Sequence, residues 1–243
     1  MRTVRYMCLF IVLITLWAGC SKDKNDCLKT TGEIVFEERT AQPFTQIEIH
    51  NNVNVIITQD TFISITIEAG KNLIGKVTTV VQGDSLVIRN ENKCNWVRSY
   101  KYDVNVYVTV LELLKIDHRG FGKVSTSNTL SATRFYISNN HNGDVVLDLD
   151  VGYLYTSMHK TGDVVLGGYA GGHEIYASGN NWLRCASLQT GYTSLHSATT
   201  GDCYVQVSDS LVAGIYSVGS IYYSGNTQTI TSTIEGSGEL IEN

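Results

Sequence analysis

The chain has 243 residues, of which 17% are charged, and a formal net charge of −5. This length suits one large domain or two fused repetitive halves. An acidic surface repels the phosphate backbone, so we expect no nucleic-acid partner. Beyond the N-terminal segment, no apolar run approaches the length of a membrane-spanning helix.

The N-terminal segment is typical of an exported protein. Two arginines precede an apolar run, residues 7–17, that is too short to span a bilayer. Small residues followed by Cys20 then resemble a bacterial lipobox. Residues 1–19 are therefore predicted to be a lipoprotein signal peptide, with Cys20 as the lipidated N-terminus of the mature chain. An ordinary signal peptide cut nearby, with Cys20 incidental, is the alternative.

The segment after Cys20 has no core pattern. Residues 20–26 are polar and are predicted to form a flexible lipidated tether. Loss of residues 1–19, with their two arginines, moves the formal charge from −5 to −7. We expect an outer-membrane, lipid-anchored protein at the cell surface, with the periplasmic face as the alternative orientation.

The next part of the chain, about 27–120, is predicted to be a region of β-strands. The sequence is rich in Val, Ile, Thr and Tyr and contains a single proline, Pro43. Apolar and polar residues alternate within residues 46–50, 53–57, 63–67, 86–88 and 104–108. Such alternation places one face of each strand on a core and the other in water.

A repeat runs through about 121–243. In each unit a glycine is followed by a polar residue and an apolar strand. The units begin at Gly122, Gly143, Gly162, Gly179, Gly201, Gly219 and Gly238. Their spacing averages just over 19 residues, which predicts an all-β solenoid with coils of about 19 residues. Each coil is too short to bury its own apolar face and needs its neighbours.

The repeat also predicts which residues form corners and core. Glycine suits a corner that needs a positive φ or a close backbone approach, and the Asp or Asn after it can bond nearby backbone. The inward positions are predicted to include Val145, Leu147, Val164, Leu166, Cys203 and Val205. The Gly179 coil fits poorly, because Asn181 would occupy a core position. One or two inserted residues there would bring Trp182, Leu183 or Cys185 into the interior.

Seven segments carry a family resemblance that covers roughly residues 27–243. They are FTQIEI (44–49), VNVIITQ (53–59), ITIEAGKNL (65–73), LVIRN (86–90), KCNWVRSY (93–100), YYSGN (222–226) and EGSG (235–238). Together they resemble the auto-transporter adhesin, head GIN domain family of Bacteroidetes. The resemblance implies a right-handed β-helix, a cell-surface or periplasmic location and an adhesin role without an established activity.

Four further cysteines of the mature chain are candidates for two disulfides, because export places them in an oxidising compartment. Cys27 and Cys94 flank the N-terminal strand region, and the resemblance implies that they occur together. Cys185 and Cys203 are 18 residues apart, about one coil. They could form a disulfide between adjacent coils or remain two buried thiols.

Metal and catalytic sites are not expected. Asp144, Asp163 and Asp202, with Asn180 between them, could line one corner and hold calcium, but the calcium-binding nonapeptide of other β-rolls is absent. We interpret these residues as solvated turn caps. The six histidines follow no metal-binding pattern and are expected to face solvent. No catalytic motif or local carboxylate cluster appears, so we predict no cofactor and no enzymatic activity.

Tyrosines are abundant in the repeat. A candidate binding surface consists of Tyr153, Tyr155, Tyr176, Tyr204 and Tyr222. These rings could stack on sugars or contact a surface protein, or they could only stabilise the sheet by cross-strand packing. The predicted role is adhesion or envelope scaffolding. The alternatives are a carbohydrate-binding accessory protein of a glycan-uptake system and, less favoured, a β-helix polysaccharide lyase or hydrolase.

Overall fold

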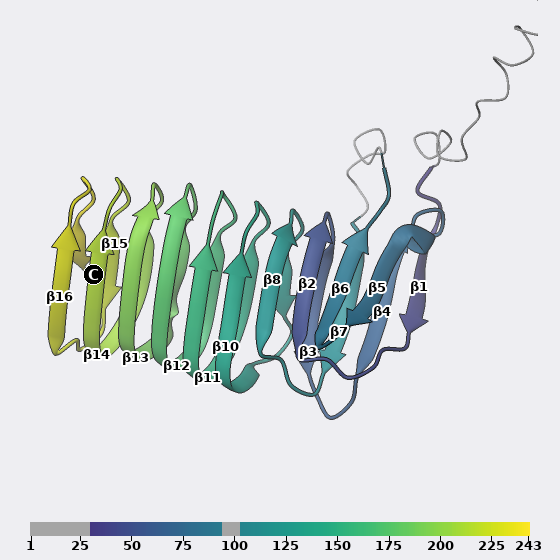
Figure 1. The fold of residues 1–243 in the computed structure, drawn as a ribbon, viewed down its shortest axis with the longest axis horizontal. Coiled ribbons are helices and arrows are strands. Elements are labelled where there is room, and N and C mark those ends of the chain that lie inside the picture. The colour runs from purple at the N-terminus through teal and green to yellow at the C-terminus, as the bar shows by residue number, and fades with distance from the viewer. Residues whose placement is uncertain (1–29, 94–102) are drawn as a thin grey trace, which may run out of the picture.

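The computed structural model describes residues 30–93 and 103–243, and this part of the chain is a β-solenoid of about 7 turns (Figure 1). Its seventeen strands join in one continuous sheet, and its coils of about 19 residues match the sequence repeat. The chain ascends one side, crosses a corner and descends the other side while it advances, which is a right-handed winding. The predicted fold class is therefore confirmed.

The regular coils use long strands that wrap from one side of the solenoid to the other. They are β8 (Lys115–Gly120), β9 (Val124–Thr126), β10 (Leu130–Asn139), β11 (Val145–Met158), β12 (Val164–Gly179), β13 (Leu183–Thr199), β14 (Cys203–Ile215), β15 (Ile221–Ser224), β16 (Thr229–Ile234) and β17 (Leu240–Glu242). All pairings among these strands are parallel. Each strand therefore pairs with its equivalent in the next coil, about 19 residues along the chain.

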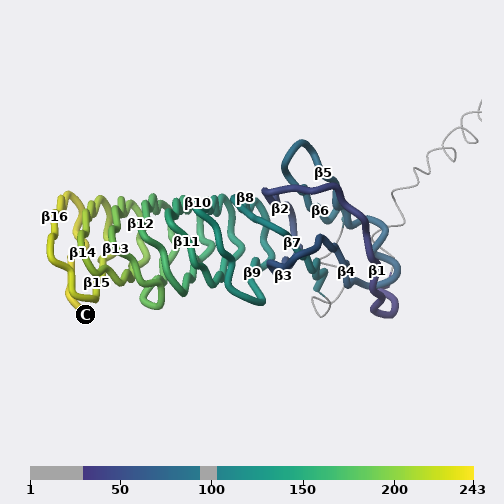
Figure 2. Tube along the Cα trace, turned by 90° about the horizontal axis from the view of Figure 1, so that it is seen from below, coloured from purple at the N-terminus to yellow at the C-terminus, as the bar shows by residue number. Residues whose placement is uncertain are grey.

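The N-terminal region supplies the first coil and its cover. Its elements are β1 (Ile34–Arg39), β2 (Gln46–Asn51), β3 (Asn54–Gln59), β4 (Ser64–Gly70), the 3₁₀ turn η2 (Ile74–Lys76), β5 (Val77–Gln82), β6 (Ser85–Asn90) and β7 (Asn105–Val110). β6 and β7 pair with one side of β2 and β3, and the chain then returns so that β8 and β9 pair with the other side. β1, β4 and β5 add antiparallel pairings at this end (Figure 2).

Two parallel ladders run the length of the solenoid. The front ladder contains β2, β8, the C-terminal parts of β10 to β14, and β16. The back ladder contains β3, β9, the N-terminal parts of β11 to β14, β15 and β17. The front ladder faces the viewer in Figure 1. Side chains alternate along each ladder, so each coil sends one set into the core and displays the other.

The corner glycines form a column in which successive coils nearly touch. A Cβ on any of six of them would lie 2.0–2.2 Å from a backbone oxygen of the preceding coil. The six are Gly122, Gly143, Gly162, Gly201, Gly219 and Gly238. None of these glycines has a positive φ, so close backbone approach is what requires glycine here.

The Gly179 coil differs from the predicted frame. Gly179 ends β12 with a φ of +102° and lies outside the corner column, where Asn181 takes the glycine's place. Leu183 and Cys185 are buried as expected, whereas Trp182 is 36% exposed. Asn181 is fully buried, and its side-chain nitrogen donates to the Ser178 carbonyl at 2.7 Å, which satisfies part of its polar group.

The predicted inward positions of the other coils are buried in one continuous hydrophobic core. They are Val145, Leu147, Val164, Leu166, Cys203 and Val205. The alternation read from the sequence therefore assigned these strand faces correctly, because residues two apart on a strand share a face.

Two histidines lie in the core rather than in solvent, which corrects the expectation for them. His118 contacts the Asn139 side-chain oxygen at 3.1 Å, and the Asn139 amide donates to the carbonyls of Gly143 and Gly162. His173 hydrogen-bonds the Thr156 hydroxyl. Burial lowers the pKa of His118 to about 4 and that of His173 to about 3. Both rings are therefore neutral at physiological pH.

Candidate binding surface

The outward side chains of the front ladder follow register columns, one residue per coil. One column contains Gln46, Lys115, Tyr136, Tyr155 and Glu174. Each of these residues is the direct register partner of the next. The Tyr136 and Tyr155 rings lie 6.3 Å apart between centroids and are tilted by 46°. The parallel register thus brings together side chains that are far apart in the sequence.

Four rings on consecutive coils form a second feature, the aromatic row, made of His159, Tyr176, His196 and Tyr216. Successive ring centroids are 5.6, 4.9 and 4.2 Å apart, and the last two contacts are stacked. Tyr176 and His196 are direct register partners. The Tyr216 ring lies over Gly214, where a Cβ would come within 2.7 Å of it.

The aromatic row is held in place and remains accessible. His159 hydrogen-bonds the hydroxyls of Ser157 at 3.0 Å and Ser178 at 2.7 Å, which fix its ring. Tyr176 is 38% exposed and Tyr216 is 40% exposed. A small cavity of about 150 Å³ adjoins the row, and both His196 and Tyr216 line it. The row therefore presents ring surface to solvent on a rigid sheet.

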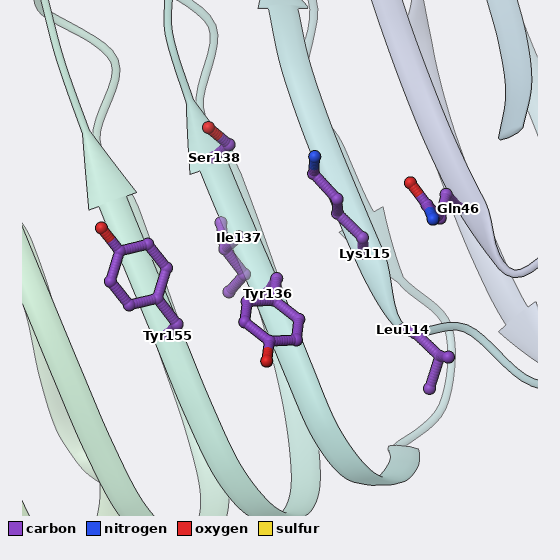
Figure 3. A pocket seen from close by; sticks show the side chains of 7 residues that line it. All are labelled: Gln46, Leu114, Lys115, Tyr136, Ile137, Ser138 and Tyr155. Carbon is purple, nitrogen blue, oxygen red and sulfur yellow. The ribbon is translucent and has the colours of Figure 1, made fainter.

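A larger cavity of about 480 Å³ opens on the same face, between β2 and β11 (Figure 3). Its lining consists of Gln46, Leu114, Lys115, Tyr136, Ile137, Ser138 and Tyr155. In Figure 3 the two tyrosine rings lie on neighbouring strands, and the lysine extends from the next strand. The lining combines apolar surface with an amide, an ammonium and hydroxyl groups, as ligand sites in proteins do.

The acidic groups near this cavity already have partners. Arg119 contacts both carboxylate oxygens of Asp117, at 3.1 and 2.7 Å. Burial alone raises the pKa of Asp117, but the Arg119 and Asn140 contacts outweigh it and hold the pKa below its usual value. Glu174 accepts a 2.5 Å hydrogen bond from the Tyr153 hydroxyl, which raises the pKa of that tyrosine to about 12.

The five tyrosines proposed from the sequence do not form one surface. Tyr153, Tyr155 and Tyr176 lie on the front ladder. Tyr204 and Tyr222 lie on the back ladder, where their rings stack 4.8 Å apart with a 9° interplanar angle. The coil alternates between two sides, so tyrosines in different halves of a repeat face different directions.

Sequence reasoning missed four of the rings that share the front face. They are Tyr136, His159, His196 and Tyr216. Part of the signal was present, because Tyr136 precedes Tyr155 by 19 residues and Tyr176 precedes His196 by 20. His196 also precedes Tyr216 by 20 residues, although the register partner of His196 is Gly214 and Tyr216 lies two residues beyond it.

Cys185 and Cys203 are both buried free thiols in the structure. Their positions on adjacent coils differ by two residues, because Cys203 pairs with Leu183 and Cys185 pairs with Val205. Burial raises the pKa of both thiols, that of Cys203 to about 11, so neither ionises readily. Of the two states left open by the sequence, the structure shows the thiols. Cys20, Cys27 and Cys94 lie outside the described residues.

The corner aspartates bind backbone of the next coil. Asp144 accepts from the Asp163 N–H, Asp163 from the Trp182 N–H and Asp202 from the Ser220 N–H, each at 2.9 Å. Trp182, and not Asn180, continues this column. Within residues 30–93 and 103–243, no three His, Cys, Asp or Glu side chains gather as a metal site would require.

The comparison with protein families decides where the chain belongs. The model of the family described as "Putative auto-transporter adhesin, head GIN domain" matches residues 43–227. The chain belongs to this family. The match covers the first coil and most of the regular repeat of the head GIN domain. No curated protein matches the chain. Among the described residues, no helix is long and apolar enough to cross a membrane.

Solved structures share the solenoid of this head GIN domain. A protein from Bacteroides fragilis NCTC 9343, described as a putative adhesin, is 20% identical with a TM-score of 0.82 and covers 87% of this chain and 97% of its own. A putative adhesin from Parabacteroides merdae ATCC 43184 is 17% identical with a TM-score of 0.68, covering 88% and 98%. A putative lipid binding protein from Parabacteroides distasonis ATCC 8503 is 18% identical with a TM-score of 0.65, covering 87% and 97%. At these identities the likeness shows the fold.

Proposed function

We propose that this protein is a cell-surface adhesin that holds glycans against the outer face of its front ladder. The observation that carries the proposal is the aromatic row, in which four rings on consecutive coils contact one another; its two tyrosines are exposed and its two histidines are half-buried. Aromatic side chains offer apolar ring faces together with polar edges, a combination that suits sugars. Membership of an adhesin family supports the same role.

Rigidity favours such a surface over a flexible loop. Tyr176 and His196 lie within β12 and β13, and His159 and Tyr216 directly follow β11 and β14. Each of these coils hydrogen-bonds a coil on each side. The rings of the aromatic row are therefore ordered before any ligand arrives, which lowers the entropic cost of binding. A row that crosses several coils also suits a chain-like ligand, because consecutive units can meet consecutive rings.

The proposed location follows from the N-terminal sequence. Lipidation of Cys20 would anchor the mature chain to the outer membrane through the tether of residues 20–26, with the solenoid at the cell surface. A single anchored chain can then display its side face to other cells or to surface polymers. The partners we propose are the membrane, through the lipid, and a glycan or glycosylated surface protein.

A second candidate is a carbohydrate-binding accessory protein of a glycan-uptake system. The cavity of about 480 Å³ favours it, because a concave site lined by both apolar and polar groups can select one defined sugar. A polysaccharide lyase or hydrolase is less favoured. Neither described cavity has an Asp or Glu in its lining, whereas glycoside hydrolysis uses a carboxylate pair.

Binding of the exported chain to immobilised glycans tests the adhesin proposal. The double variant Tyr176→Ala, Tyr216→Ala should lose at least about tenfold in binding, because it removes two exposed rings of the row. The matched control is Tyr204→Ala, Tyr222→Ala, which removes two rings from the back ladder. Equal binding by both double variants would refute the front-face proposal. Micromolar affinity for a single sugar, with no binding to other surfaces, would favour the uptake role.

A further inference from the structure

The larger cavity on the front ladder is lined by two tyrosine rings that suit stacking against a sugar. Tyr136 and Tyr155 project outward from adjacent coils, and the cavity between β2 and β11 has a volume of about 480 Å³. Small-molecule sites commonly measure roughly 300–1,000 Å³. The cavity crosses four neighbouring strands of the ladder, so it spans about 14 Å at a strand spacing of ~4.8 Å. It is long enough for a short oligosaccharide.

Polar groups surround the two rings. The Gln46 amide lies at one end of the cavity, and its side chain makes no hydrogen bond within the described residues. The Ser138 hydroxyl accepts from the Asn140 amide at 3.0 Å and keeps its own O–H available to donate. An amide and a hydroxyl both complement sugar hydroxyls, which are donors and acceptors at once.

Of the described residues, Lys115 is the one charged side chain that lines the cavity, and the neighbouring Asp117 carboxylate interacts with it electrostatically. Within residues 30–93 and 103–243, the Lys115 ammonium forms no hydrogen bond or ion pair. Asp117, two residues further along β8, is engaged by Arg119. Arg134 precedes Tyr136 by two residues on β10, so it projects from the same face, and it too has no ion-pair partner in the described chain.

No acidic side chain lines the cavity to balance these cations. The acid next in the register column is Glu174, beyond Tyr155, and it already accepts the Tyr153 hydroxyl. An anion entering the cavity would therefore meet the Lys115 ammonium directly, beside two aromatic rings and an amide. The arrangement is asymmetric, with the cation at the β8 side and the rings at the β10 and β11 side.

We infer that this cavity binds an acidic sugar residue, whose ring stacks on Tyr136 and Tyr155 and whose carboxylate or sulfate contacts Lys115. The inference rests on the proposed function, because it names the ligand class of the same face. The formal charge of the whole chain is −5, which would repel an anion at long range. Salt screens that repulsion beyond about 8 Å, so the groups lining the cavity decide the local preference.

Calorimetry with the exported chain and three matched oligosaccharides tests the inference. The probes are a trimer of galacturonic acid, the uncharged galactotriose and a sulfated chondroitin oligosaccharide. At least one acidic probe should bind about tenfold more tightly than galactotriose, and its affinity should weaken with added salt. The two acidic probes separate carboxylate from sulfate recognition. Equal affinity for all three probes would overturn the inference.

Substitutions locate the binding and separate charge from stacking. Lys115→Met should abolish the preference for the acidic probe over galactotriose, whereas Lys115→Arg should retain the preference. Tyr136→Leu should weaken binding of both kinds of sugar. Lys123→Met removes an equivalent charge at a back-ladder corner and is the matched control. If Lys115→Met and Lys123→Met behave alike, the assignment of Lys115 is wrong.

The outcomes also separate this inference from the proposed function. Neutral glycans held by the front face without any preference for acidic ones would overturn the inference and leave the adhesin role standing. If the wild-type chain bound no glycan at all, both the inference and the proposed function would be overturned. Lys115 and Tyr136 lie at the surface, so urea unfolding of their variants should match the wild type and exclude misfolding as the cause.

Discussion

The N-terminal region and the regular coils build the same kind of core by different means. In the N-terminal region β5 and β6 form an antiparallel hairpin that turns at Gly83, whose φ is +60° and whose Cβ position is empty. In the coils Gly162 has no positive φ, yet its Cβ position lies 2.2 Å from the Gly143 oxygen. A glycine near the N-terminus can thus serve the local turn, whereas a corner glycine serves the neighbouring coil.

The pairing pattern shows the same contrast. The N-terminal end contains antiparallel pairs, of which β5 and β6 connect through a short local turn, and these strands cover that end of the solenoid. The regular coils have parallel pairings alone among β8 to β17, so every residue depends on one about 19 positions away. Substitutions in the coils should therefore act through their neighbours more strongly than substitutions near the N-terminus.

The largest expected effect is at the glycine corner. Gly162→Ala should lower the free energy of unfolding by about 3–5 kcal/mol or prevent folding, because its methyl group would overlap the Gly143 carbonyl. Gly83→Ala is the matched change in the hairpin and should cost only about 1–2 kcal/mol, from its positive φ. Urea unfolding of both variants measures the difference. Equal losses would remove the distinction between the two regions.

The second effect is on pH dependence and comes from His118 in the coil interior. Its folded pKa of about 4 lies below the unfolded value of 6.5, so the unfolded chain binds the proton more readily. The contribution of the neutral His118 to the free energy of unfolding is complete above pH 6.5. It is lost as the pH falls toward 4, by up to about 3 kcal/mol. Urea unfolding at pH 7 and pH 4.5 should show a smaller difference for His118→Gln than for the wild type. An unchanged difference would contradict a buried, neutral His118.

A smaller effect is expected at the aspartate column. Asp163→Ala removes the acceptor for the Trp182 N–H and should lower stability by about 1 kcal/mol. Asp150→Ala on the same side of the repeat is the control, because Asp150 is exposed and makes no hydrogen bond within the described chain. Urea midpoints compare the two variants. A loss for Asp150→Ala as large as for Asp163→Ala would mean that the column adds no stability of its own.

The smallest effect is expected on the back ladder. Tyr222→Ala removes the stacking contact with Tyr204 and should cost no more than about 1 kcal/mol, since the ring is partly exposed. Thermal unfolding measures this change, with Tyr155→Ala on the front ladder as the comparison. A loss of several kcal/mol for Tyr222→Ala would show that the outward rings support the core.

Much of the coil could be read from the sequence, because a stacked repeat makes local and distant patterns coincide. The inward positions Val145 and Val164 were predicted from alternation and are fully buried. The predicted corner position was wrong at Gly179. This glycine has a positive φ and lies two residues before the true corner position, Asn181. Glycine serves both purposes, and the sequence does not show which one applies.

The binding surface was harder to predict for a related reason. The sequence grouped Tyr204 and Tyr222 with Tyr176. In the structure the first two lie on the back ladder and Tyr176 lies on the front ladder. Side-chain direction within a coil depends on where the strand bends, as between Cys185 and Gln189, where the register with the next coil shifts. Small shifts of this kind change which face a residue joins, and no residue type marks them clearly.

The sequence by itself determined the all-β class, the coil length of about 19 residues and most of the core, because periodic burial must appear as periodic apolar residues. Only the tertiary structure decided that His118 and His173 are buried, that Cys185 and Cys203 are unpaired, and which rings share the front ladder. These features depend on the register between coils. Register is set by the packing of whole coils against each other, and a single strand does not specify it.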